Sequence, residues 1–178
     1  MQATTPRTLW ISRMGLLLAL TLAVQVLGLP QPVTGPAVNA ILLLSVLLVG
    51  WKPAAGIGVI TPLIAMIRGQ LPPVLAPLVP FIMLGNAVWV LSFTALWHLK
   101  KPTNEMIRLV FGILIGAILK TAWLWLAAVW TVPVILGKPI PHAVATAMTL
   151  PQFITALIGG AVAWISYKIL IRRGVSEQ

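Results

Sequence analysis

"GILIGAILKTAWLWLAAVW", residues 112–130, decides the fold class of this chain. All but one of its residues are uncharged, and a helix needs about 20 apolar residues to cross the hydrocarbon core of a bilayer. The stretch therefore predicts a membrane-spanning helix. The exception is Lys120, whose ammonium group falls near the middle of that helix, where a charge is costly. What this group faces is the main question that the sequence raises.

The rest of the chain has the same apolar character. Its 178 residues are 60% hydrophobic and 8% charged, with a mean hydropathy of +1.04. Soluble domains carry roughly a quarter charged residues, so the composition predicts an all-α integral membrane protein. The absence of cysteine excludes disulfides and thiolate metal sites. Two histidines and two acidic residues leave little for a metal-centred enzyme, and we expect no cofactor.

Proline, glycine and charged residues divide the chain into six candidate spans within one membrane domain, residues 1–178. The first follows Arg7 and Arg13 as a signal peptide would, but it lacks a clear cleavage site and leads into further spans. We therefore interpret it as a retained helix. The second and third spans are short and meet near Trp51. The expected spans are 10–29, 37–51, 54–68, 77–98, 106–131 and 150–171.

The basic residues are distributed unevenly over this arrangement. Twelve Lys and Arg against two acidic residues give a net charge of +10, which in a soluble protein would suggest nucleic acid. Here we expect no nucleic-acid partner, because the charges fit the positive-inside rule and predict that both termini are cytoplasmic. The opposite loops hold only Arg68 and Lys138. One side holds Arg7, Arg13, Lys52, Lys100, Lys101, Arg108, Lys168, Arg172 and Arg173.

With this orientation, several spans contribute polar groups to the outer half of the membrane. Ionisable residues at such depth usually face the bundle interior or a water-filled cavity. Each polar group also has a structural alternative: Asn39 can cap a helix, and Asn86 and Gln152 can form hydrogen bonds between helices. The candidate binding residues in this zone are Asn39, Arg68, Asn86, Lys120, Gln152 and Thr155.

Lys120 carries the functional hypothesis. Its alternative is to lie along lipid with its ammonium group in the interface. However, it lies about ten residues, or ~15 Å, from the outer end of its span, and no acidic residue elsewhere in the membrane neutralises it. We therefore expect Lys120 to line a wet cavity that receives an anion from outside. Trp123 shares its helix face and is expected to form a pocket wall or to pack. His142, in an outer loop, is a further candidate contact.

Residues 15–23, "GLLLALTLA", place Gly15, Ala19 and Ala23 on one stripe of the first span. Small side chains allow another helix to approach closely. Here the chain resembles the substrate-binding S components of energy-coupling factor (ECF) vitamin transporters, since Ala19 and Ala23 match the AxxxA motif that this family docks against its transmembrane coupling subunit. Residues 34–86, from "TGPAVNAILLL" to "FIMLGN", are also similar.

The resemblance implies a six-helix S-component bundle in the plasma membrane of a prokaryote. It implies a ligand site in the outer half, built by the later helices and the outer loops. It also implies two kinds of protein partner, a transmembrane coupling subunit and ATPase subunits. These implications agree with the depth at which Asn86, Lys120 and Gln152 are expected.

Three classes of function compete at this point. The first is the capture subunit of an ECF-type importer, binding a small, water-soluble, anionic, vitamin-like compound. The chain has no GxxxxGK[ST] loop and no intramembrane acids for ion coupling, so it would need an ATP-driven module. The second is an intramembrane enzyme, but GxSxG, HExxH and paired carboxylates are absent, and we expect no catalytic residues. The third is a membrane assembly subunit without a ligand, in which polar residues serve packing alone.

Overall fold

A computed structural model describes residues 6–71, 73–100 and 104–175 of the chain. Within these ranges the chain is helical and contains no strand, which confirms the predicted all-α class. The elements are α1 (Pro6–Val26), α2 (Gln31–Val49), α3 (Trp51–Ile67), a 3₁₀ segment η1 (Pro73–Leu78), α4 (Val79–Trp97), α5 (Glu105–Leu126), a π-helical turn η2 (Ala127–Thr131), α6 (Val132–Leu136), α7 (His142–Ala147) and α8 (Leu150–Arg172).

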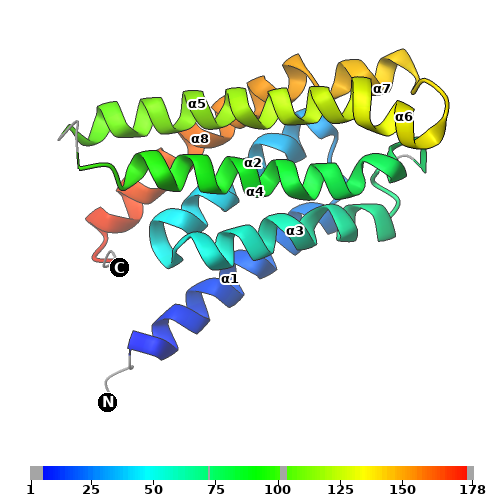
Figure 1. The fold of residues 1–178 in the computed structure, drawn as a ribbon. Coiled ribbons are helices and arrows are strands. Elements are labelled where there is room, and N and C mark those ends of the chain that lie inside the picture. The colour runs from blue at the N-terminus through cyan, green and yellow to red at the C-terminus, as the bar shows by residue number, and fades with distance from the viewer. Residues whose placement is uncertain (1–5, 72, 101–103, 176–178) are drawn as a thin grey trace.

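The helices form a membrane bundle. Five helical segments of the described chain are long and apolar enough to cross a bilayer, and α3 is a shorter apolar helix of 17 residues. At 1.5 Å per residue α3 is about 26 Å long, slightly less than the ~30 Å hydrocarbon core. The two ends of the chain lie at one end of the bundle, and the connection from α6 to α7 lies at the other (Figure 1). An even number of crossings produces this arrangement.

Helix α2 is the centre of the bundle and contacts α1, α3, α4 and α8. Its sequence is apolar on all sides between residues 40 and 49, which is the pattern of a helix buried all round. Its one hydroxyl in this stretch, on Ser45, is fully buried and donates to the carbonyl oxygen of Ile41 at 2.7 Å. The central helix therefore has no unsatisfied side-chain group at this depth.

The segments expected as outer loops contain more helix than their prolines suggested. Helix α2 begins at Gln31 rather than near residue 37. Pro30, which is extended, precedes it, and Pro32 lies in the first turn, where its missing N–H has no helical partner to lose. The connection expected between the spans 106–131 and 150–171 contains α7, and η1 occupies part of the connection expected between the spans 54–68 and 77–98. This end of the bundle is therefore built from short, ordered helices.

Helix α5 continues beyond the expected limit at residue 131. It runs through η2 into α6 and ends at Leu136. Pro133 cannot donate an N–H to the carbonyl of Val129, so α-helical bonding is interrupted here, and the π-helical turn η2 lies directly before it. The whole segment from Glu105 to Leu136 has 32 residues.

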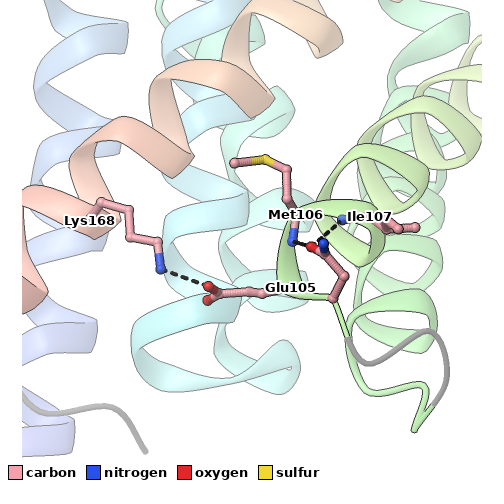
Figure 2. Close-up of polar contacts among 5 residues, drawn as sticks. Glu105, Met106, Ile107 and Lys168 are labelled. Carbon is pink, nitrogen blue, oxygen red and sulfur yellow. Dashed lines mark hydrogen bonds and ion pairs between the residues drawn. The ribbon is translucent and has the colours of Figure 1, made fainter.

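Polar contacts fasten α5 at the end of the bundle where the termini lie. The side-chain oxygen of Asn104 accepts hydrogen bonds from the backbone N–H groups of Met106 (2.9 Å) and Ile107 (3.4 Å) and so caps the helix (Figure 2). The Glu105 carboxylate lies 2.8 Å from Nζ of Lys168 on α8 (Figure 2). The basic residues that we assigned to the cytoplasmic side lie toward this end of the bundle. Lys101 is the exception, because it lies outside the described residues.

Candidate functional site

A cavity of about 490 Å³ opens at the end of the bundle opposite the termini. This volume lies within the range of about 300–1,000 Å³ that is usual for small-molecule sites. Its walls come from the α1–α2 connection, α2, α3 and the segment after it, α4, α5, and the junction of α7 and α8. The polar residues that line it are Gln25, Gln31, Thr34, Asn39, Thr61, Gln70, Asn86, Lys120 and Gln152.

The ammonium group of Lys120 lies on the wall of this cavity and is held by two carboxamides. Its Nζ donates to Oδ1 of Asn39 at 2.6 Å and to Oδ1 of Asn86 at 3.0 Å. Lys120 is only 3% exposed. Glu105, the acidic residue within the described ranges, pairs with Lys168 at the other end of the bundle. The acceptors of Lys120 are therefore neutral, and its charge is not cancelled by a carboxylate of this part of the chain.

A proline in the neighbouring helix orients Asn86. Pro62 lies inside α3 and has no N–H, so the carbonyl oxygen of Gly58, four residues earlier, lacks its helical donor. The side-chain Nδ2 of Asn86 supplies that donor at 2.9 Å. Because Nδ2 faces Gly58, Oδ1 is turned toward Lys120. Pro62 of α3 thus helps to fix one acceptor of the ammonium group.

Asn39 is fixed by α8 and α4. Its Nδ2 donates to Oγ1 of Thr155 at 3.5 Å, and Thr155 Oγ1 donates to the backbone oxygen of Gln152 at 3.0 Å. The backbone oxygen of Asn39 also accepts a hydrogen bond of 3.4 Å from Nε1 of Trp89, which is fully buried. Both amide groups next to Lys120 are therefore held in position before any ligand arrives.

The hydrogen-bond capacity of Lys120 is not exhausted by these contacts. An ammonium group has three N–H donors, and two are used by Asn39 and Asn86. One N–H remains for an acceptor in the cavity. A cation that is oriented but not neutralised favours an anionic oxygen at this point, because charge-assisted hydrogen bonds are roughly twice as strong as neutral ones.

With this geometry, the comparison with known families is decisive. The model of the family described as "ECF transporter, substrate-specific component" matches residues 11–171. The chain belongs to this family. It is an S component, and S components are membrane transport subunits that bind a substrate rather than enzymes. No curated protein and no solved structure matches the chain.

The structure of this S component brings together part of the residue set expected from the sequence. Asn39, Asn86, Lys120 and Gln152 all line the cavity. Thr155 lies behind Asn39, where its hydroxyl oxygen accepts from the Asn39 side chain. The polar groups that were placed at one depth thus converge on one cavity.

Three expected site residues of the S component lie away from the cavity. Trp123 packs between α5 and α4, where its Nε1 donates to the backbone oxygen of Phe81 at 2.9 Å. Arg68 is exposed and caps the C-terminus of α3. His142 is exposed in α7, and its Nδ1 lies 3.5 Å from Oγ1 of Thr146.

Sequence reasoning missed several polar residues of the cavity. Gln25 lies in the last turn of α1, and Gln70, from the segment after α3, donates through Nε2 to the backbone oxygen of Gln25. The signal for Gln25 was present, because it is the lone carboxamide in the apolar run at residues 20–29. The other missed polar lining residues are Gln31, Thr34 and Thr61.

The small-residue stripe of the S component is open on the surface of α1. Gly15, Ala19 and Ala23 are all exposed. A Cβ atom added to Gly15 would meet no atom within 4 Å among its surroundings. This face of α1 is therefore not used for packing within the described chain.

Proposed function

We propose that this S component captures a small, water-soluble, anionic, vitamin-like compound in the cavity around Lys120. It would deliver the compound inward with the coupling and ATPase subunits of an ECF module in the plasma membrane of a prokaryote. The observation that carries the proposal is the ammonium group of Lys120, which lines the cavity and is held by the two neutral side chains of Asn39 and Asn86.

The charge of the cavity supports an anionic substrate. Burying an ammonium group costs free energy, and the two amide oxygens offset part of that cost without removing the net charge. A carboxylate or phosphate at the free N–H of Lys120 would both neutralise the charge and complete its hydrogen bonds. A neutral ligand would complete the hydrogen bonds but would leave the charge of Lys120 in place.

The position of the cavity supports capture from outside. It lies at the end of the bundle opposite the termini, and most basic residues lie at the terminal end. The positive-inside rule assigns the basic end to the cytoplasm. The cavity would then open to the exterior, where a high-affinity importer must collect its substrate.

The open stripe on α1 supports docking to a coupling subunit. Gly15, Ala19 and Ala23 present backbone at the surface with little side chain over it. Within a membrane, such faces associate by close helix packing. Docking at this stripe would supply the energy source that the chain itself lacks.

Native mass spectrometry of gently extracted protein tests the proposal. We expect an acidic small molecule to remain bound to the unaltered protein and to be lost from a Lys120→Met variant. Losing one charge-assisted hydrogen bond of about 1.5–3 kcal/mol corresponds to at least about tenfold weaker binding. Lys138→Met, which removes an exposed cation at the same end, is the matched control and should retain the compound.

Thermal unfolding with defined compounds provides a second readout. Benzoate and hippurate should raise the melting temperature more than benzamide and hippuramide, their neutral amides, and only in proteins that keep Lys120. No bound acid and no stabilisation by any carboxylate would contradict capture. Together with a stable complex with partner subunits, that result would favour the assembly function.

A further inference from the structure

Two buried carboxamides in the cavity have side chains without a hydrogen-bond partner among the residues that the structure describes. Gln25, in the last turn of α1, is 6% exposed, and Gln152, in the first turn of α8, is 9% exposed. Both line the cavity, and neither side chain forms a hydrogen bond with another residue of the described chain. Both differ in this respect from Asn39 and Asn86, whose oxygen and nitrogen atoms are all engaged.

The other polar side chains on the inner wall are satisfied locally. Thr34 donates to the backbone oxygen of Pro30, and Thr61 donates to that of Ile57. Gln70 is only half-buried, and its Nε2 donates to the backbone oxygen of Gln25. The groups left for a substrate on the buried wall are therefore the side chains of Gln25 and Gln152 and one N–H of Lys120.

An unpaired buried carboxamide sets a demand on any ligand. Leaving such a group without a hydrogen bond costs about 1–3 kcal/mol. Water can meet this need in an open cavity, but a substrate that displaces the water loses affinity unless it replaces the hydrogen bonds. A glutamine side chain offers both a C=O acceptor and N–H donors, so its best complement has both kinds of group.

The arrangement of these groups gives the substrate a direction. Gln152 precedes Thr155 by one turn of α8, and Thr155 contacts Asn39, which holds Lys120. One turn corresponds to about 5 Å along the helix. Gln25, in the last turn of α1, lines the same cavity. The charged end of a substrate thus belongs next to Lys120, with its donor and acceptor groups about one turn nearer the end of the bundle where α8 begins.

On the basis of the proposed function, we infer that the substrate is a monoanionic acid that also carries an amide-like or ureide-like group. Its acidic oxygen takes the free N–H of Lys120, and its amide-like group pairs with Gln25 and Gln152. These two glutamines determine specificity, whereas Lys120 selects the charge.

Three defined probes separate these roles. Hippurate has an amide and a carboxylate, 3-benzoylpropionate replaces the amide N–H by a methylene group, and hippuramide keeps the amide but lacks the charge. In the unaltered protein we expect hippurate to bind about tenfold more tightly than 3-benzoylpropionate, because a site built to hydrogen-bond an N–H rejects the analogue that lacks it. Hippuramide should bind more weakly than hippurate. Isothermal titration measures all three.

Leucine variants locate the effect. In Gln25→Leu and Gln152→Leu the preference for hippurate over 3-benzoylpropionate should fall toward one, while the affinity for 3-benzoylpropionate stays unchanged. Lys138→Met is the control, because Lys138 is exposed and does not line the cavity, and it should keep the preference. If a leucine variant does not fold, the preference of the unaltered protein for hippurate over 3-benzoylpropionate still tests whether the site recognises an amide group.

The outcomes distinguish this inference from the function on which it rests. Equal binding of the two acids, lost in Lys120→Met, would overturn the role of the glutamines and leave anion capture intact. An acidic compound without N–H or amide groups in the native mass spectrum would do the same, whereas one that carries an amide or ureide would support the inference. The absence of any bound acid and of any acid binding would overturn both.

Discussion

Gly159 of α8 lies directly against Asn39 of α2. A Cβ atom added to Gly159 would be 2.6 Å from Cβ of Asn39 and 2.8 Å from the backbone oxygen of Pro36. Real Cβ atoms essentially never approach so closely, so the glycine is required for the distance between the two helices. Because Asn39 holds Lys120, this helix crossing also sets the position of the ammonium group.

Gly159→Ala should therefore destabilise the bundle. Overpacking costs about 1–3 kcal/mol, which outweighs the gain of about 0.8–1 kcal/mol from replacing a helical glycine. We expect a melting temperature several degrees lower in detergent. Gly15→Ala is the control, because open space surrounds that position and the change should be neutral or slightly stabilising. Equal melting temperatures for the two variants would show that α2 and α8 can separate without cost.

Pro62→Ala should separate stability from binding. The new backbone N–H at position 62 can bond to the Gly58 oxygen, which then no longer needs the side chain of Asn86. The melting temperature should stay the same or rise, while the affinity for a carboxylate such as hippurate should fall several-fold because Asn86 is no longer held. Pro133→Ala, outside the cavity lining, should leave the affinity unchanged. Unchanged affinity in Pro62→Ala would mean that the proline does not orient Asn86.

Asn86→Asp tests whether Lys120 binds an external anion because it lacks an acidic partner in the described protein. A carboxylate in place of the amide would lie near 3.0 Å from Nζ of Lys120 and neutralise it within the protein. We expect carboxylate binding to weaken at least about tenfold, since the cavity no longer needs an external anion. Asn104→Asp adds the same charge at the other end of α5, where an aspartate still caps the helix, and serves as the control. Titration with hippurate compares the variants.

The two contacts at the start of α5 should contribute differently to the stability of the protein. Asn104→Ala removes a helix cap that accepts two backbone hydrogen bonds and should cost about 1 kcal/mol. Glu105→Gln breaks the ion pair with Lys168. The side chain of Lys168 is 41% exposed and that of Glu105 is 40% exposed, so we expect a smaller loss of stability of at most about 1 kcal/mol. Thermal unfolding ranks the two variants. A larger effect of Glu105→Gln would identify the ion pair as the main fastening.

Much of the fold and part of the site could be predicted from the sequence, for a simple reason. A polar residue inside an apolar span has few places to go, so depth alone grouped Asn39, Asn86 and Lys120, and the structure places them in contact. The helix ends were less predictable. Prolines at positions 30, 32 and 36 suggested a loop. However, Pro30 precedes the helix and Pro32 lies in its first turn, where proline is tolerated, so that Pro36 alone lies inside α2.

The direction of a side chain around its helix axis was the main source of the differences between the predicted and the observed site residues. Trp123 follows Lys120 by three residues, which turns it about 60° away from the lysine. That angle is enough to direct the indole toward α4, where the Phe81 oxygen accepts its N–H. Gln25 was overlooked because it lies at the end of α1, and its place in the cavity depends on the distant segment after α3, from which Gln70 contacts it.

The length of the segment from Glu105 to Leu136 has a consequence for how cargo enters. Its 32 residues extend about 48 Å, well beyond a hydrocarbon core of ~30 Å. If its capped start lies near the cytoplasmic surface, α6 and α7 stand above the opposite leaflet, among lipid headgroups or in solvent. The entrance is then raised clear of the acyl chains, so that polar solutes arrive by diffusion through water, and lipids are kept from the opening.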